Sequence, residues 1–356
     1  MYKKNKKIAI YSNAWDTNAG GGITYVLALA NLLTSRQFDV TVFFFETVNE
    51  TELRSRYKTG DLQIKFIERK PFPLLEQLKF AFKERLYYDI VIQQSLVAPR
   101  ITLVKKSYIL CDFPMKKIES LSEKIRLRTW QHVIANSEFT KHWILKRWHR
   151  SAHVIYPPIE NPTELPLNKN EDWVCIGRFN EGERSKRQDI VIACFIDVIR
   201  KGKTNCKLHL IGYVGDRKFV NRLKKQAEGY PIVFHENGSL ETQKEILEHS
   251  AFYISACGYK IDETKQPMFV EHYGISVVEA MAHGCIPLVI GKGGHKETVD
   301  HGINGYHWNT EEALKFYIMK LLENTSELKK DMAASAYLKS KSYDFNSVKK
   351  NVKKIF

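Results

Sequence analysis

The sequence predicts an α/β protein with two domains, each built on a parallel β-sheet that helices cover on both faces. Short apolar segments alternate with helical segments on both sides of a proline pair, Pro157 and Pro158. Such alternation is typical of parallel sheets, and paired prolines stop regular structure and form a stiff connector. Since 356 residues are enough for two domains, we expect a first domain over residues 1–160 and a second over residues 161–340.

The expected strands are short apolar runs, and the expected helices between them have one apolar face. In the first domain, strands are expected at residues 7–11, 39–45, 62–67, 90–92, 107–110 and 133–135, and helices at 23–35, 74–86 and 139–148. In the second domain, strands are expected at residues 173–177, 207–212, 232–235, 251–255 and 286–290, and helices at 190–199, 216–228, 240–249, 275–283 and from 311 onward.

A glycine-rich loop, Asn18–Gly22, separates the first strand from the first helix. Gly21 and Gly22 have no Cβ, so the backbone can approach a ligand closely there. The loop is not GxGxxG and has no Walker lysine, which disfavours a nicotinamide-dependent dehydrogenase and a P-loop protein.

Asp112 follows an expected strand and precedes Pro114 by two residues. Ligands of such sheets bind beyond the carboxyl ends of the strands, which makes Asp112 a candidate site residue by its position. The other interpretation is a turn residue before a proline, and the sequence leaves both open.

The segment from Glu271 to Ile290 predicts a loop, a helix, a glycine stop and a buried strand. Gly274 permits a tight turn. The first N–H groups of the helix that follows have no partner within the helix, so they can bind a phosphate or a sugar hydroxyl. Glu271 and Glu279 are either ligands of such a group or ordinary acidic residues near a helix start.

These two glutamates are separated by seven residues. Tyr-Gly-Ile follows the first closely, and Glu-Ala-Met-Ala-x-Gly-x-x-Pro begins at the second. The pattern resembles family 4 of the retaining glycosyltransferases, which have the GT-B fold. The resemblance implies two Rossmann-like domains that face each other across a cleft. It also implies a C-terminal helix, over about residues 341–356, that packs back on the first domain.

The resemblance implies roles for residues of the second domain. Glu271 would hold the donor sugar together with the N–H groups of Gly274 and Ile275, and Glu279 would hold the ribose of the nucleotide. The residue type suits this chemistry, because an ionised carboxylate only accepts hydrogen bonds and can take two vicinal hydroxyls.

Further residues match the family outside this segment. Gly-Arg-Phe followed by Lys-Arg-Gln-Asp resembles its phosphate-binding pair, which places Arg178 and Lys186 on the pyrophosphate. Gly21 and Gly22 would lie beside the donor phosphates and the acceptor. Many members carry a histidine or another polar residue at the place of Asp112, facing the acceptor. We therefore take Glu271 and Asp112 as the catalytic candidates.

The family transfers a sugar without a metal ion. The six cysteines show no CxxC spacing and the twelve histidines no HExxH, so we expect no metal and no cofactor besides the nucleotide-sugar substrate. We expect a glycan or a lipid-linked acceptor, as in the synthesis of cell-surface polysaccharide or glycolipid. Tyr-Pro-Pro and Glu-His-Tyr-Gly-Ile are similar to pieces of mannosyltransferases, which slightly favours a GDP-mannose-like donor; UDP- and dTDP-sugars remain open.

The net charge of +15 lies mainly in the first domain, where residues 1–160 carry 26 Lys+Arg against 15 Asp+Glu. This excess favours an anionic partner. Residues 115–130 and 141–150 are expected to form basic amphipathic helices, with Ile118, Leu121 and Ile125 on one face of the first and Trp143 and Trp148 in the second. Such helices either touch an anionic membrane or pack on the sheet with a solvated basic face.

The sequence has no signal-peptide pattern and no apolar run of eighteen residues, so we expect a cytoplasmic protein, peripheral on the inner face of the membrane. The alternative function is a non-catalytic scaffold of the same fold that binds an anionic polymer or a membrane. No nucleic acid is expected, because aromatic residues and bases are not interleaved as in strand-binding proteins.

Overall fold

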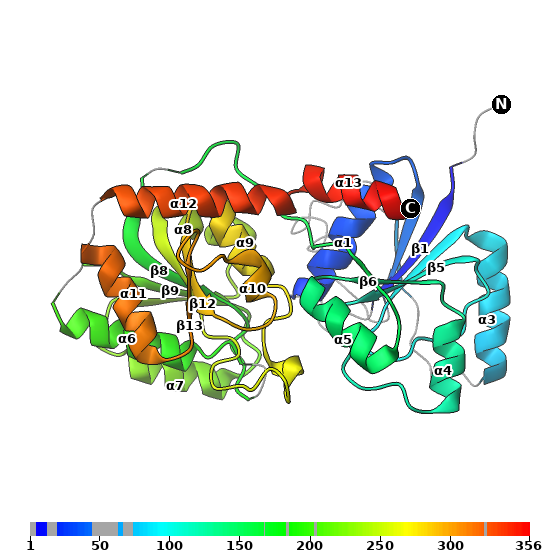
Figure 1. Cartoon of the computed structure of the whole chain (residues 1–356), viewed down its shortest axis with the longest axis horizontal. Coiled ribbons are helices and arrows are strands. Elements are labelled where there is room, and N and C mark those ends of the chain that lie inside the picture. The colour runs from blue at the N-terminus through cyan, green and yellow to red at the C-terminus, as the bar shows by residue number, and fades with distance from the viewer. Residues whose placement is uncertain are drawn as a thin grey trace. The chain divides into compact units, whose positions relative to one another are not determined.

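A computed structural model shows two compact units, Met1–Pro158 with Val348–Phe356, and Ile159–Ser347 (Figure 1). The structure describes residues 5–12, 20–44, 63–66, 74–166, 168–182, 185–202, 205–323 and 326–356. The division falls after residue 158, two residues before the expected boundary.

The first unit contains a seven-stranded sheet in the order β3-β2-β1-β4-β5-β6-β7, and all its strand pairings are parallel. Its strands are β1 Lys7–Ser12, β2 Asp39–Phe44, β3 Gln63–Phe66, β4 Ile90–Gln94, β5 Lys106–Cys111, β6 His132–Ala135 and β7 His153–Val154. The strand order reverses direction between β1 and β4, and in such sheets ligands bind beyond the carboxyl ends at this point.

The helices of the first unit are α1 Gly21–Thr34, α3 Leu74–Tyr87, α4 Leu121–Arg128, α5 Glu138–Trp148 and α13 Phe345–Ile355. Helix α1 begins two residues before the expected Ile23. Several expected residues, namely Asn18, Ala19, Phe45, Leu62 and Ile67, lie outside the described residues.

The helix expected over residues 115–130 is shorter in the structure, where α4 starts at Leu121. Ser120 caps it, because its hydroxyl accepts a hydrogen bond from the Glu123 N–H while the Glu123 carboxylate accepts one from the Ser120 N–H. The expected apolar face is therefore divided: Ile118 precedes the helix and is buried, whereas Leu121 and Ile125 are exposed.

The helix expected near residues 141–150 also presents a different face from the expected one. In α5, Trp148 is buried in the core, and its indole N–H donates to the Lys116 carbonyl at 3.2 Å. Leu145 is the exposed apolar residue of this helix. Trp148 therefore packs on the sheet and is not available to a membrane.

The second unit contains a six-stranded sheet in the order β10-β9-β8-β11-β12-β13, again with parallel pairings. Its strands are β8 Asn170–Ile176, β9 Leu208–Gly212, β10 Ile232–Glu236, β11 Ser250–Ser255, β12 Ile286–Ile290 and β13 Tyr306–Trp308. Its helices are α6 Gln188–Arg200, α7 Arg217–Ala227, α8 Leu240–His249, α9 Ile275–Ala282, α10 His295–Thr298, α11 Glu311–Glu323 and α12 Ser326–Ser340. The α/β class and the alternation predicted from the sequence are confirmed in both units.

Each unit has its own apolar core. In the second unit, Trp173 of β8 packs edge-on against Phe195 of α6, with ring centroids 5.1 Å apart. All six cysteines are free thiols and buried. Within the described residues, no three His, Cys, Asp or Glu side chains gather in a way that could hold a metal ion. None of the helices in this described part combines the length and the apolar character needed to cross a bilayer.

The last residues of the chain belong to the first unit. Val348 and Val352 of α13 are buried, and the Tyr108 hydroxyl of β5 donates to the Ile355 carbonyl at 2.9 Å. The Phe356 ring lies against Tyr108 with centroids 4.4 Å apart. Residues 341–343, expected in the same helix, form a separate 3-10 turn.

Candidate functional site

The segment from Glu271 to Ile290 forms the predicted loop, helix, glycine stop and strand. Gly274 is the N-cap of α9 and has a left-handed φ of 93°, which favours glycine. Gly274 has no side chain to cap this helix, and the first turn of the helix holds no acidic residue. The Gly274 turn brings the helix start against Glu271, because a Cβ on Gly274 would lie 3.2 Å from Glu271 Cγ. The first backbone N–H groups of α9, at the positive end of the helix dipole, thus lie near Glu271, where they can bind a ligand.

Glu271 and Lys186 form an ion pair of 2.5 Å between Oε2 and Nζ. Their side chains are 17% and 28% exposed. Burial alone would raise the pKa of Glu271, but the Lys186 ammonium outweighs burial and brings this pKa down to about 2. Burial likewise disfavours the ammonium, yet Glu271 raises the pKa of Lys186 above its ordinary value. Both groups are therefore charged at any physiological pH.

A glycine lets Lys186 reach this position. Lys186 lies just before α6, and its aliphatic stem crosses Gly177 at the end of β8, where a Cβ would lie 2.4 Å from Lys186 Cγ. Arg178 follows Gly177 directly and is partly buried, and its carbonyl accepts a hydrogen bond from Gln188 Nε2 at 3.2 Å. The structure thus places Arg178 and Lys186 at the two ends of one strand-to-helix loop.

Glu279 lies on α9 and contacts a residue that the sequence analysis missed. Gln243 of α8 donates from Nε2 to Glu279 Oε2 at 3.1 Å. Burial raises the pKa of Glu279 to about 7; the bond from Gln243 opposes this rise and the nearby Glu160 adds to it. A carboxyl group in this state can change its protonation when a ligand binds.

The glycine loop after β12 packs against the backbone of the Glu271 segment. The Gly294 N–H donates to the Glu271 carbonyl at 2.8 Å. Lys292 and Lys296 point elsewhere: Lys292 Nζ donates to the Ile261 carbonyl at 2.6 Å, and Lys296 pairs with Glu263. Lys292 and Lys296 therefore tie the glycine loop to the segment around residues 261–263.

His295, at the start of α10, is completely buried beside the Glu271 segment. Its Nδ1 lies 2.9 Å from the Ile290 carbonyl, so this nitrogen carries the proton, and Nε2 has no hydrogen-bond partner among the described residues. Burial lowers the pKa of His295 to about 4, against the opposing effect of Glu271. The imidazole is therefore neutral.

In the first unit, three polar side chains meet at the carboxyl ends of neighbouring strands. The Ser12 hydroxyl of β1 donates to Gln94 Oε1 of β4 at 3.1 Å, and Gln94 Nε2 donates to Asp112 Oδ2, after β5, at 2.6 Å. Burial raises the pKa of Asp112 to about 6, although the bond from Gln94 opposes this. The Asp112 carboxylate thus takes part in a polar group at the carboxyl ends of the strands.

The start of α1 adjoins this polar group. Gly21 and Gly22 are its first residues, and the Gly22 carbonyl accepts a hydrogen bond from Gln94 Nε2 at 3.2 Å. A Cβ on Gly22 would lie 2.9 Å from Gln94 Nε2 and 3.2 Å from Asp112 Oδ2. Gly22 therefore lets the helix start approach Asp112, and Gln94 is a second residue that sequence reasoning missed.

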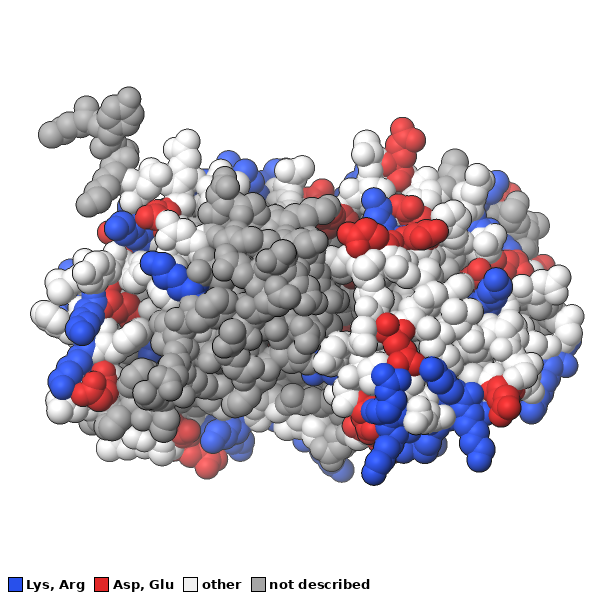
Figure 2. All heavy atoms as spheres, turned by 180° about the vertical axis from the view of Figure 1, so that it is seen from behind, with Lys and Arg blue, Asp and Glu red and all other residues white. Residues whose placement is uncertain are grey.

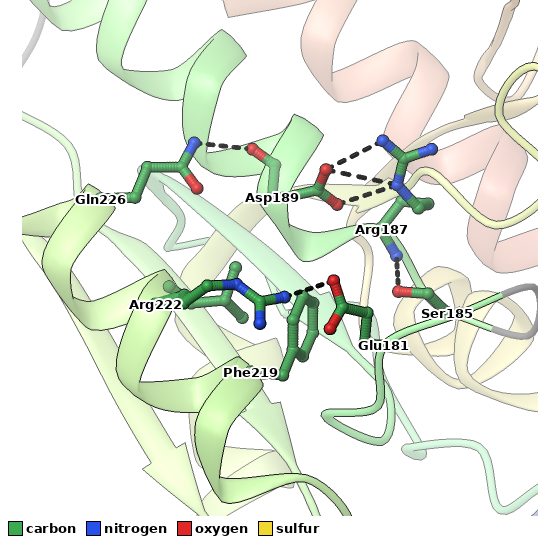
Figure 3. Close-up of a pocket in the computed structure, with 9 residues that line it drawn as sticks. Glu181, Ser185, Arg187, Asp189, Phe219, Arg222 and Gln226 are labelled. Carbon is green, nitrogen blue, oxygen red and sulfur yellow. Dashed lines mark hydrogen bonds and ion pairs between the residues drawn. The ribbon is translucent and has the colours of Figure 1, made fainter.

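A hollow beside α6 and α7 is a separate feature of the second unit (Figure 3). Arg187 binds the Asp189 carboxylate at 2.9 Å, and Arg222 pairs with Glu181 at 2.5 Å. Each of these two arginines has an acidic partner within the hollow, so the hollow offers no net positive charge to a phosphate. Arg184, in the loop before Arg187, lies outside the described residues.

Comparison with known proteins gives a family match over the second unit. A family model described as "Glycosyl transferases group 1" matches residues 160–339. The GDP-Man:Man(3)GlcNAc(2)-PP-Dol alpha-1,2-mannosyltransferase of Kluyveromyces lactis is 30% identical over an alignment of 174 residues, and the match covers 43% of this chain and 28% of that protein. The chain thus spans less than a third of the length of this relative. The alpha-1,3/1,6-mannosyltransferase ALG2 of Saccharomyces cerevisiae is 23% identical over 86% of this chain and 73% of its own.

Solved structures share the fold of the whole chain. A glycosyltransferase from Rickettsia africae ESF-5 aligns with a TM-score of 0.74 at 19% identity, over 99% of this chain and 98% of its own. Anabaena Alr3699/HepE, solved in complex with UDP and glucose, aligns with a TM-score of 0.72 at 17% identity, over 98% and 99%. These likenesses confirm the GT-B fold predicted from the sequence.

Proposed function

The chain belongs to the group 1 glycosyl transferases, and from this premise we propose that it transfers a sugar from a nucleotide-sugar to an acceptor hydroxyl with retention of configuration. The second unit would bind the donor. The observation that carries this assignment is the Lys186–Glu271 ion pair beside the uncapped start of α9. A cation, a carboxylate and free N–H groups in one place suit a ligand that has both a pyrophosphate and sugar hydroxyls.

Each group would have one task. Lys186 and Arg178 neutralise the pyrophosphate and stabilise it as a leaving group. Glu271 accepts hydrogen bonds from hydroxyls of the donor sugar, and the N–H groups at Gly274 and Ile275 face the same sugar. The ion pair with Glu271 holds Lys186 in position before the donor arrives. We propose that these cations act without a metal ion, so turnover in excess EDTA should equal turnover without it.

The proposed substrates follow from the mannosyltransferase relatives, whose names give both a nucleotide-linked hexose and a lipid-linked acceptor. The mannosyltransferase relatives are named for GDP-Man and for an oligosaccharide on PP-Dol. We therefore propose a GDP-mannose-like donor and a glycan or lipid-linked acceptor, in polysaccharide, glycolipid or glycoconjugate synthesis. The proposed place is the cytoplasmic face of a membrane, where the protein is peripheral.

The test begins with ligand binding. A thermal-shift screen of the protein against GDP, UDP, dTDP and their sugar conjugates identifies the base, because a ligand that binds only the native state raises the melting temperature. The conjugate that gives the largest shift is then incubated with a polyprenyl-pyrophosphate-linked sugar, and the product is analysed by mass spectrometry. No shift with any conjugate from a folded protein would overturn the proposed function.

Glu279 gives a pH dependence to the proposed ribose contact. Hydroxyls donate to the ionised carboxylate, so binding favours the deprotonated form and lowers its pKa from about 7. Protonated Glu279 must lose its proton on binding, and donor affinity should fall by up to about tenfold for each pH unit below that pKa. Calorimetric titration at pH 6, 7 and 8 with the nucleotide-sugar measures this. The Glu279→Gln variant should show no such dependence, and a wild-type affinity independent of pH would contradict the assignment.

Asp112 is the proposed catalytic residue of the first unit. Its carboxylate, held by Gln94, would take or direct the proton of the acceptor hydroxyl. Asp112→Asn should lower turnover by about a hundredfold and leave the donor-induced thermal shift nearly unchanged, since Lys186, Glu271 and Glu279 lie in the second unit and asparagine keeps the size of the side chain beside Gly22. Full turnover in this variant would leave Asp112 with a structural role only.

A further inference from the structure

Helix α3 turns an apolar face outward. Four large apolar side chains recur on it every three or four residues and remain well exposed: Leu75 (63%), Leu78 (40%), Phe82 (58%) and Leu86 (69%). Residues at this spacing share one face of a helix. Ala81 and Glu84 are buried, on the face that packs against the rest of the unit. Most helices bury their apolar stripe, so the orientation of α3 needs an explanation.

A buried ion pair fixes this orientation. Arg100 binds both oxygens of Glu84, at 2.9 and 2.5 Å, and its guanidinium lies 4.8 Å from the centre of the Phe80 ring. The Glu84 side chain is 1% exposed. Turning the apolar stripe inward would leave two charges without partners, which is strongly unfavourable in a buried site. The exposed apolar face is therefore part of the folded unit.

Bases border this apolar face. Lys79, Lys83 and Arg85 are exposed on α3, and the described side chains of the helix include one exposed acid, Glu76, which pairs with Lys79 at 2.9 Å. Figure 2 shows Lys and Arg, with some Asp and Glu among them, beside uncharged side chains along the edge of the first unit where Figure 1 places α3.

The neighbouring helix α4 has the same combination. Leu121 and Ile125 are exposed on it together with Lys124 and Arg128. Arg100 lies near both helices, because its carbonyl accepts the Trp130 indole N–H at 2.7 Å, just beyond the end of α4. Exposed apolar and basic side chains therefore occur on both α3 and α4 of the first unit.

We propose that the exposed face of α3, extended by α4, docks on an anionic lipid bilayer. The apolar side chains would enter the interfacial region and the bases would contact lipid phosphates. A bilayer fits better than a protein partner, because long basic side chains around apolar ones can reach phosphates while their stems stay in the apolar layer. The proposal deepens the proposed function and in that sense rests on it, since such a bilayer carries the lipid-linked acceptor.

The test is flotation of the full chain with vesicles of phosphatidylcholine and phosphatidylglycerol at a 70:30 ratio in low salt. The wild type should float with these vesicles and much less with phosphatidylcholine alone. Leu78→Ser/Phe82→Ser and Lys79→Glu/Lys83→Glu should each lower the partition coefficient by at least about tenfold. Matched controls in the second unit, Phe316→Ser/Leu338→Ser and Lys218→Glu/Lys225→Glu, replace residues of the same kinds that are also exposed and should bind as the wild type does.

Three results would overturn the proposal: a wild type that does not float, α3 variants that float as well as the wild type, or a dimeric wild type whose α3 variants become monomers without any vesicle binding. The last result would identify α3 as a self-association surface. No donor is present in these assays. A nucleotide-sugar thermal shift in the same preparations shows that each variant is folded, and it tests the proposed donor site separately.

Discussion

Replacing Lys186 with methionine is expected to remove most of the turnover and to lower the free energy of unfolding. Glu271 would lose the cation 2.5 Å away while remaining mostly buried, and an uncompensated carboxylate in such a place costs about 2–3 kcal/mol after allowance for its partial exposure. The pyrophosphate would lose one of its two proposed cations, which should reduce kcat by about a hundredfold to a thousandfold. Urea denaturation and initial rates measure the two effects.

A second substitution separates stability from function. Lys186→Met combined with Glu271→Gln replaces both charges by neutral groups of similar shape, so most of the lost stability should return. Turnover should stay low, because neither the phosphate cation nor the sugar-binding carboxylate is present. A double variant that regains both would show that the pair is purely structural, contrary to the proposed donor site.

Gly293→Ala is expected to be strongly destabilising for the second unit. A Cβ at this position would lie 2.1 Å from the Glu271 carbonyl oxygen and 2.8 Å from Val270 Cγ2, and the residue has a left-handed φ of 59°. The obstacle is backbone, so one of the two loops must move. We expect a loss of about 3–4 kcal/mol in the free energy of unfolding, from overpacking and the unfavourable φ together. Because Glu271 moves as well, the affinity for the donor should also fall.

Gly302→Ala is the matched control for this substitution. Gly302 also has a left-handed φ, of 79°, but a Cβ there would have no neighbour within 4 Å. It should cost about 1 kcal/mol, from the backbone conformation alone. Equal losses in the two variants, measured by denaturation, would mean that the contact between the two loops contributes nothing.

The parts of the site that local sequence determines could be predicted. Gly274, the helix after it and the strand to Ile290 follow from the positions of glycines and apolar residues within one segment. The pairing of Lys186 with Glu271 could not be predicted from spacing, because they lie 85 positions apart in the sequence and the fold alone brings them together. Family resemblance placed both near the donor but did not reveal their direct contact.

The amide partners Gln94 and Gln243 carried no motif signal. Their positions at a strand end and near a helix start were the only indications, and many residues share such positions. The start of α4 was different, since Ser120 followed three residues later by Glu123 is a capping-box pattern that the sequence displayed. A helix that begins after a cap at Ser120 does not include Ile118. The outward face of α3 depends on the buried Glu84–Arg100 pair, which no helical periodicity reveals.

The chain order has a consequence for biosynthesis. Residues 348–356 complete the first unit, while the whole second unit lies between them and residue 158. A ribosome therefore finishes the second unit before it has made the residues that cover Tyr108. The first unit begins to be synthesised first and can be completed only last, so a nascent chain stalled before Val348 should display an intact second unit beside an unfinished first one.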